Sequence, residues 1–246
     1  MSERAATDGV PGALVDELVA ANRILGHEGV LDAYGHVSVR HPDHPDWFLL
    51  SRARSPEYVE AADIMTFDLD GAVVGDGGPV PYIERFIHAA VYGARPDVGA
   101  VCHNHALAIL PFSIAREVPL RRTVHAARLF GDGVPVWDIA EEFGTSTDLL
   151  VRSIDQGRSL ARRLGAGPVA LMRGHGSVVA ARELRAVVRA CLDMERGARA
   201  QVDLLALDPL VRPTDAEPAA PPDLSPDGPG ADREWEHLCH RAGVGS

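Results

Sequence analysis

The sequence has few cysteines, and none lies close to another. Cys102, Cys191 and Cys239 form no CxxC pair or other short spacing. Closely spaced cysteines are typical of disulfide frameworks in small secreted domains. The pattern therefore predicts free thiols in a reducing compartment, and we expect a cytoplasmic protein.

Positive charge and long apolar runs are also scarce. Lys and Arg number 24 against 35 Asp and Glu, a formal net charge of −11. Nucleic acids and anionic membrane surfaces demand clustered positive charge, and a membrane span needs about 18 or more consecutive apolar residues. The N-terminal segment lacks the apolar core of a signal peptide. We therefore expect a small-molecule substrate and neither a nucleic-acid nor a membrane partner.

Hydrophobic spacing predicts a mixture of helices and short strands within one domain, which we place at residues 1–210. Apolar residues at helical spacing predict helices over residues 13–26, 82–93, 145–165 and 181–206, the third capped by Thr145 or Ser146. Short alternating or β-rich stretches predict strands over residues 35–40, 46–51, 63–71, 101–107 and 134–138, and a hairpin over 168–180. A turn at Asp70-Gly71 favours antiparallel pairing of the early strands.

The C-terminal segment, residues 211–246, differs in composition from the rest. Six of the 17 residues from Pro213 to Pro229 are proline, a content that excludes a helix or a central strand. The segment ends in "DREWEHLCH", where Trp235 and Leu238 predict a short amphipathic helix. This helix can dock on its own chain or on a neighbouring subunit.

Four residues form a candidate metal site. His103 and His105 in "VCHNHAL" lie two positions apart, so in an extended chain both imidazoles point to one face. His175 lies between two glycines in "MRGHGSV", and Glu84 precedes the histidine strand on the helix predicted before it. Three histidines with a nearby carboxylate suit a divalent ion that keeps an open position for catalysis. Glu84 could instead complement the dipole of its helix.

The motifs "GHVSVR", "IERFIHAAVYGARPDVGAVCHNHA" and "RGHGSVV" closely resemble the class II aldolase/adducin family over roughly residues 13–205. The resemblance implies an α/β domain with a central, largely antiparallel sheet flanked by helices, assembled as a homotetramer with active sites near subunit interfaces. It also implies that Glu84, His103, His105 and His175 hold a divalent ion such as Zn²⁺, Mn²⁺, Fe²⁺ or Co²⁺. Family chemistry makes or breaks a C–C bond beside a carbonyl, with Glu84 as a candidate acid or base.

The sequence departs from the sugar-phosphate aldolases where those enzymes bind phosphate. It has Gly35-His36, "LLSRARSPE" and Tyr82 in place of the phosphate-binding loops. Arginine holds a carboxylate through two parallel hydrogen bonds, so Arg52, with Ser51 and Tyr82, is expected to bind a flat carboxylated substrate. Arg54 is a second candidate for this carboxylate, and a place in a solvated surface loop explains it nearly as well.

The combination of "SRARSPE", "DIMTFDLDG", "HNHA", "PFS" and "LMRGHG" is most similar to a family subgroup that contains hydroxyphthalate-type aromatic decarboxylases and non-haem iron oxygenases. We therefore expect a metal-dependent carbon–carbon lyase that decarboxylates a hydroxylated aromatic or related acid through a metal-stabilised enolate. His36 and His125 could donate to a substrate oxygen or be ordinary polar residues. The alternatives are an iron oxygenase on the same ligands, a sugar-phosphate aldolase and a non-catalytic adducin-like binding module.

Overall fold

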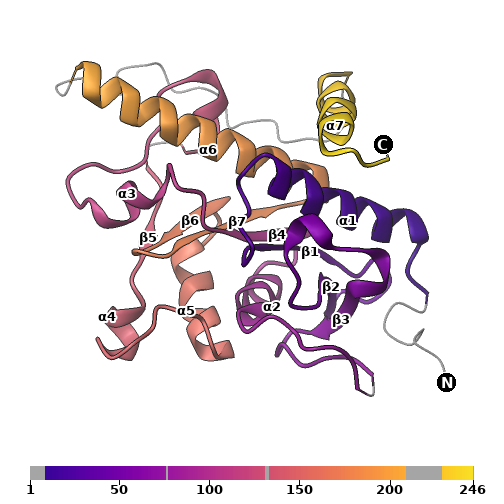
Figure 1. The fold of residues 1–246 in the computed structure, drawn as a ribbon. Helices are drawn as coiled ribbons and strands as arrows, with labels where there is room; N and C mark the ends of the chain where they lie inside the picture. The colour runs from indigo at the N-terminus through magenta and orange to yellow at the C-terminus, as the bar shows by residue number, and fades with distance from the viewer. Residues whose placement is uncertain (1–8, 76, 131–132, 209–228, 246) are drawn as a thin grey trace.

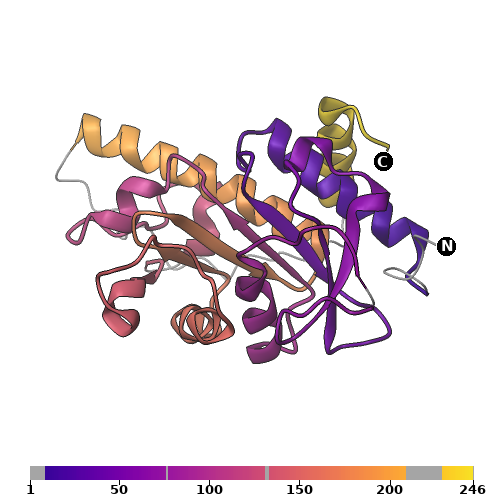
Figure 2. The ribbon, with the colours of Figure 1, turned by 60° about the horizontal axis from the view of Figure 1, so that its bottom comes forward.

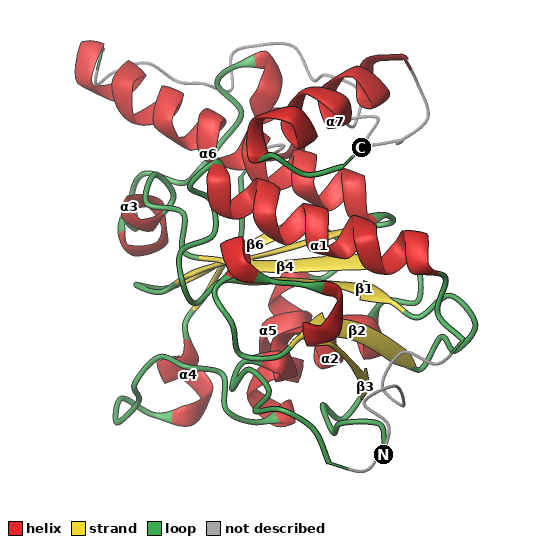
Figure 3. Cartoon of the chain, turned by 45° about the vertical axis from the view of Figure 1, so that its right-hand side comes forward, coloured by secondary structure: helices red, strands yellow, loops and turns green. Residues whose placement is uncertain are grey.

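The central element is a seven-stranded sheet between two layers of helices (Figures 1 and 3). A computed structural model describes residues 9–75, 77–130, 133–208 and 229–245, apart from the side chains of 125, 126, 128 and 229. The strands are β1 (His36–Arg40), β2 (Trp47–Ser51), β3 (Ile64–Asp68), β4 (Ala100–Asn104), β5 (Val136–Trp137), β6 (Val169–Met172) and β7 (Gly176–Ala181). Their order across the sheet is β3-β2-β1-β4-β7-β6-β5.

The sheet is largely antiparallel, as predicted. Every neighbouring pair of strands runs antiparallel except β5 and β6, which are parallel. Strand β4 lies in the middle of the order, where its residues pair with β1 on one side and β7 on the other. Residues of β4 are therefore held on both edges, which suits a strand that carries functional side chains.

Two hydrophobic cores separate the sheet from its helices. One face packs on α1 (Gly12–His27) and α6 (Leu184–Leu207), and the other on α2 (Arg85–Ala94) and α5 (Ile154–Leu164). Helix α7 (Pro229–Ala242) packs on α1, on the side away from the sheet. Figure 2 shows the two helical layers on opposite sides of the strands. Alternation along β4 sends Cys102 into the first core and Val101 into the second. The remaining helices are α3 (Leu110–Ile114), α4 (Ile139–Phe143) and three short 3-10 turns, η1 (Pro56–Tyr58), η2 (Ala61–Asp63) and η3 (His125–Phe130).

The C-terminal helix α7 packs on its own chain. Trp235, Leu238 and Cys239 are buried and belong to the core formed with α1 and α6. Arg185 of α6 places its guanidinium 5.0 Å from the centre of the Trp235 ring. The predicted domain boundary near residue 210 and most of the proline-rich segment lie outside the described residues. None of the helices in the described ranges is both long and apolar enough to cross a lipid bilayer.

Three helix starts differ by more than one residue from the sequence-based prediction, and one of them is that of α6, which was predicted from residue 181 and begins at Leu184 because Ala181 still belongs to β7. The helix predicted from residue 145 begins at Ile154, with Ser153 as its cap accepting a hydrogen bond from the Gln156 amide. Leu149 adopts a left-handed backbone (φ +68°), which a helix cannot contain, and the amide of Val151 bonds to a side chain instead of a helical carbonyl. The capping assignment to Thr145 or Ser146 is therefore wrong.

The third difference concerns α2, which begins at Arg85 and not at residue 82. Glu84 is therefore the residue immediately before the helix and does not lie in its first turn. This position leaves its side chain free to turn toward the sheet.

The packing of α5 against α2 provides a test of this arrangement. A Cβ added to Gly157 would lie 2.3 Å from the carbonyl oxygen of Phe86 and 3.0 Å from the Cβ of Ala90. Gly157→Ala should force the helices apart and lower the free energy of unfolding by about 1–3 kcal/mol. Gly93→Ala is the matched control, because its Cβ meets nothing within 4 Å and a helical alanine gains up to about 1 kcal/mol. Chemical denaturation that found equal stability for both variants would contradict the packing.

Candidate metal centre

His103 and His105 lie together at the end of β4. His103 is in the strand, where its backbone pairs with His36 of β1 and Val178 of β7. His105 follows directly after the strand, and its Nε2 atom lies 3.0 Å from Nε2 of His103. The two imidazoles lie side by side as expected, although the strand ends at Asn104 and not at the predicted residue 107.

His175 reaches the same point from the turn between β6 and β7. Its Nε2 atom lies 3.1 Å from Nε2 of His105. The turn requires glycine on both sides: Gly174 has a positive φ of 66°, and a Cβ on Gly176 would lie 2.2 Å from the carbonyl oxygen of Asn104. Only glycine allows the hairpin to approach β4 this closely.

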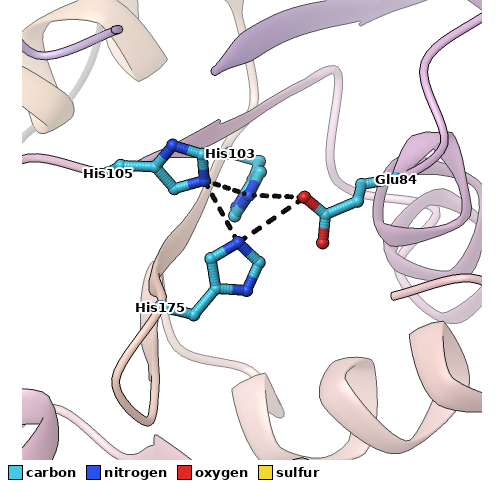
Figure 4. A group of neighbouring side chains, drawn as sticks. All are labelled: Glu84, His103, His105 and His175. Atoms are coloured by element: carbon cyan, nitrogen blue, oxygen red, sulfur yellow. Dashed lines mark hydrogen bonds and ion pairs between the residues drawn. The ribbon is translucent and has the colours of Figure 1, made fainter. Parts of the chain in front are cut away.

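Glu84 completes the group from the start of α2 (Figure 4). Its Oε2 atom lies 3.3 Å from Nε2 of His103 and 3.5 Å from Nε2 of His175. Its Oε1 atom accepts a 2.9 Å hydrogen bond from the amide of Val151. This bond fixes the carboxylate, so that one oxygen faces the histidines. One ligand atom from each of the four side chains lies within 4.8 Å of the others.

The second ring nitrogens of two histidines face groups that can only accept hydrogen bonds. Nδ1 of His103 lies 3.0 Å from the carbonyl oxygen of Ser177, and Nδ1 of His105 lies 3.0 Å from Oδ2 of Asp32. Each Nδ1 must therefore carry hydrogen. Local sequence patterns do not indicate Asp32, Ser177 or Val151 as parts of the site, because each contact joins segments that are 67 or more positions apart.

In the neutral form that metal binding requires, these rings point electron lone pairs at one another. A neutral imidazole with hydrogen on Nδ1 has an unprotonated Nε2, and the Nε2 atoms of His103 and His105 are 3.0 Å apart. Burial lowers the pKa of His105, and burial together with the charge of His103 lowers the pKa of His175 to about 4. Neutral rings so close together repel unless a cation lies between them. The donor set thus fits a divalent metal ion, and these four residues could hold one.

Glu84 is charged in this environment. Burial alone would raise its pKa, but attraction and a hydrogen bond from His103, attraction from His175 and the Val151 amide outweigh burial and hold the pKa at about 2. The side chain is therefore a carboxylate at neutral pH. A carboxylate beside three imidazoles offers the mixed nitrogen and oxygen ligand set of catalytic metal sites.

His36 lies beside this cluster, and Tyr82, one of the predicted substrate-binding residues, lies beside His36. The His36 ring centre is 5.3 Å from that of His103 and 4.3 Å from that of Tyr82. Tyr82 is buried and donates its hydroxyl hydrogen to the carbonyl oxygen of Arg54. Ser51, at the end of β2, is fully buried. The structure thus brings Tyr82 and His36 next to the metal cluster.

The two arginines are joined to an internal carboxylate. Nε of Arg52 and Nη1 of Arg54 each lie 2.6 Å from an oxygen of Asp63. A bridge between Arg52 and Pro81 keeps this segment beside the residues that precede Glu84. The side chain of Arg54 is 27% exposed, so its interpretation as a freely solvated loop residue misses the ion pair. His125 begins η3, and its side chain lies outside the described part of the chain.

Comparison with known proteins decides the family. A profile described as "Class II Aldolase and Adducin N-terminal domain" matches residues 16–202. The chain belongs to this family. The crystal structure of an aldolase II superfamily protein from Pseudomonas syringae matches 96% of this chain and 95% of that chain, with a TM-score of 0.73 and 21% identity. At this identity the likeness shows the fold, and it confirms the predicted fold class.

Similar proteins of this family are named decarboxylases. Decarboxylase tropJ of Talaromyces stipitatus is 38% identical over 174 residues, which are 66% of this chain and 65% of that protein. A 3,4-dihydroxyphthalate decarboxylase of Terrabacter sp. is 29% identical over 244 residues, which are 92% of this chain and 96% of that protein. The expected family is confirmed, as is the expectation of an enzyme over an adducin-like binding module.

Metal binding by this class II aldolase family member should depend on its three histidines. Replacement of His103, His105 or His175 by Ala should remove most bound metal, because each supplies a converging Nε2 atom. The sheet is held by two hydrophobic cores, so the variants should still fold. Elemental analysis after dialysis, with circular dichroism as the folding control, checks this prediction. Full metal occupancy in all three variants would refute the assignment.

Asp32 should influence metal affinity without contacting the metal. Asp32→Asn keeps the size of the side chain but weakens its bond with Nδ1 of His105, and loss of such an outer contact typically costs about 10–100-fold in metal affinity. Asp70→Asn in an exposed turn is the matched control and should leave affinity unchanged. Competition titration with a chelating dye measures both, and equal affinities would rule out a role for Asp32.

Proposed function

We propose that this protein is a divalent-metal-dependent carbon–carbon lyase that decarboxylates a hydroxylated aromatic or related carboxylic acid. The observation that carries the proposal is the convergence of three imidazole Nε2 atoms and the Glu84 carboxylate at one point. The named relatives support this reaction over other family reactions, since two of them are called decarboxylases.

The ion would be held by His103, His105 and His175, with Glu84 as fourth ligand or as acid and base. Nitrogen and carboxylate donors suit Zn²⁺, Mn²⁺, Fe²⁺ or Co²⁺. When bound, such an ion acts as a Lewis acid that stabilises negative charge developing on a substrate oxygen. Glu84 has Oε1 tied to the amide of Val151, which leaves Oε2 to exchange a proton with substrate.

Glu84 would move the proton that decarboxylation requires. As a carboxylate it can take the proton of a ring hydroxyl, which places electron density on the ring carbon that bears the carboxylate. Return of the proton from Glu84 to that carbon gives the keto tautomer of the ring. The C–C bond then breaks, CO₂ departs, and its electron pair passes into the ring and restores the phenolate, which takes a proton from water. The reaction involves no change in oxidation state.

Other residues would bind and orient the acid. We assign substrate binding to Ser51, Arg52 and Tyr82, and hydrogen-bond donation to His36 and His125. Arg52 uses Nε for Asp63, so a substrate carboxylate would meet the terminal nitrogens of its guanidinium. The side chain of Arg52 is 37% exposed. Asp63, held between Arg52 and Arg54, would fix the orientation of both guanidinium groups.

A Schiff-base mechanism is not available to the side chains of this chain. All 24 of its basic residues other than histidine are arginines, and the sequence contains no lysine. Lyases that activate a carbonyl without a metal use a lysine amine for that purpose. This composition supports the proposal that the ion at the His and Glu cluster supplies the electron sink. A homotetramer with sites near its interfaces and a cytoplasmic location stay predictions.

The substrate class can be tested directly. Hydroxylated aromatic acids and, separately, ketose and aldehyde phosphates should be incubated anaerobically with protein loaded with Mn²⁺, Fe²⁺, Co²⁺ or Zn²⁺. We expect CO₂ release from at least one acid, detected by a coupled assay. Turnover of a sugar phosphate without CO₂ from any acid would favour an aldolase, and strict dependence on O₂ and Fe²⁺ would favour the oxygenase alternative.

Glu84→Gln should retain the fold and lose turnover. The amide keeps the shape and can still accept from Val151, but it cannot carry the proton, so the rate should fall by about 10²–10⁴-fold. Glu57→Gln, an exposed residue of η1, is the control and should keep full activity. Steady-state kinetics at saturating metal measure both. Near-native turnover by the Glu84 variant would remove this residue from the mechanism.

A further inference from the structure

A chain of buried polar groups leads from the metal cluster into the space between β1 and α2. Nδ1 of His36 lies 2.7 Å from Nε2 of His88, and Nδ1 of His88 lies 2.6 Å from Oγ of Ser38. Oγ of Ser38 lies 2.8 Å from the hydroxyl oxygen of Tyr92. All four residues are at most 1% exposed. Such burial of four polar side chains is costly unless they bond to one another.

The fold places these groups on facing surfaces. His36 and Ser38 are alternate residues of β1, so they share one face of the strand. Glu84, His88 and Tyr92 follow at intervals of four along the start and body of α2, so they share one face of the helix. The same helix face therefore delivers Glu84 to the metal cluster and His88 to His36.

Each of the four hydrogen-bonded side chains has one hydrogen to donate when its group is uncharged. Burial lowers the pKa of His88 to about 3 and lowers the pKa of His36 well below its usual value. Burial also raises the pKa of Tyr92, which keeps its hydroxyl hydrogen. Two neutral imidazoles and two hydroxyls thus supply four hydrogens for three internal bonds. One hydrogen is left for a partner outside the chain of groups.

The place left for the fourth hydrogen favours one direction for these bonds. If Tyr92 donates to Ser38, Ser38 donates to Nδ1 of His88, and His88 donates from Nε2 to His36, every bond is 2.6–2.8 Å long and the fourth hydrogen lies on Nε2 of His36. In the reverse order Ser38 donates to Tyr92 over the same distances, and the fourth hydrogen stays on the hydroxyl of Tyr92, which is 1% exposed and has Ser38 as its described hydrogen-bond partner. A buried hydroxyl hydrogen without an acceptor is costly. The outward direction therefore leaves His36 with its hydrogen on Nε2.

We propose that His88 is a positioning residue that fixes His36 as the Nε2–H tautomer, so that His36 donates a hydrogen bond from Nε2 to an oxygen of the bound acid. The His36 ring stands between Tyr82 and His103, beside the place where the substrate would bind. The substrate part of this inference rests on the proposed function, whereas the tautomer of His36 does not.

Nitrogen-15 NMR of the imidazoles tests the tautomer in the wild-type protein. Histidine-labelled protein is measured at neutral pH without metal and with Zn²⁺ as the diamagnetic probe, and the His36 signals are assigned with His36→Gln. We expect a protonated Nε2 and an unprotonated Nδ1 for His36. A hydrogen on Nδ1 of His36 would overturn the proposal.

Variants of His88 show whether this residue sets the tautomer of His36 or only supports the fold. His88→Phe removes both nitrogens and should give His36 a mixture of tautomers, whereas His88→Gln keeps a donor near the Nε2 position and should restore the wild-type tautomer. Ser38→Ala provides a second route should His88→Phe fail to fold, because it removes the donor to His88. His44→Phe, in an exposed loop, is the matched control. An unchanged His36 tautomer in folded His88→Phe or Ser38→Ala would overturn the role of His88.

Kinetics connect the tautomer with the substrate. A hydrogen bond to a charged acceptor is worth a factor of about 10–100, so His88→Phe should lower kcat/KM for the acid by that factor, and His88→Gln should recover most of it. The loss should fall mainly on KM, since the donor meets the bound carboxylate or ring oxygen. Equal kcat/KM for wild type and His88→Phe would overturn the substrate part. Failure of every acid to release CO₂ would instead refute the proposed function and leave the NMR result standing.

Discussion

The close approach of the β6–β7 turn to the end of β4 is the contact on which the site depends. Gly176 lies so near the carbonyl of Asn104 that no side chain fits there, and this approach carries His175 to His105. A larger residue would separate the imidazoles even if every other strand stayed in place. Because β4 is paired on both edges, the separation could not be relieved by movement of His103. Backbone packing thus fixes three of the four candidate ligands before any ion binds.

Helix α2 positions the remaining candidate ligand, Glu84, and also His88, which lies on the same face of the helix. Glu84 precedes the helix and is tied to Val151 at the approach to α5, so the packing of α5 on α2 also positions the carboxylate. One turn further, His88 contacts His36 on β1. The metal cluster and the proposed substrate-binding side are therefore coupled by a single rigid element. A disturbance of α2 would be expected to affect both at once.

The elements that the sequence predicts correctly are those set by the spacing of apolar and polar residues along a short segment. The spacing of two positions predicted that His103 and His105 lie side by side, although only His103 is in β4, and helical spacing located α1, α2 and α6 to within a few residues. The start of α5 was wrong because the amide of Val151 serves Glu84, a contact that no local pattern records. Asp32 and Ser177 were missed for the same reason. His88 did carry a signal, since it follows Glu84 by four positions and shares its helix face, but a lone histidine in an apolar helix is also common in protein cores.

X-ray absorption at the zinc edge tests the central claim, that three imidazoles and a carboxylate hold a divalent ion at the end of β4. Protein reconstituted with one equivalent of Zn²⁺ should show about three imidazole nitrogens at roughly 2.0–2.1 Å together with oxygen. The imidazole contribution should fall by about one ligand in a folded His175→Ala variant, since His175 supplies one of the three rings. A shell containing sulfur at about 2.3 Å, or an oxygen shell without imidazole, would contradict the account.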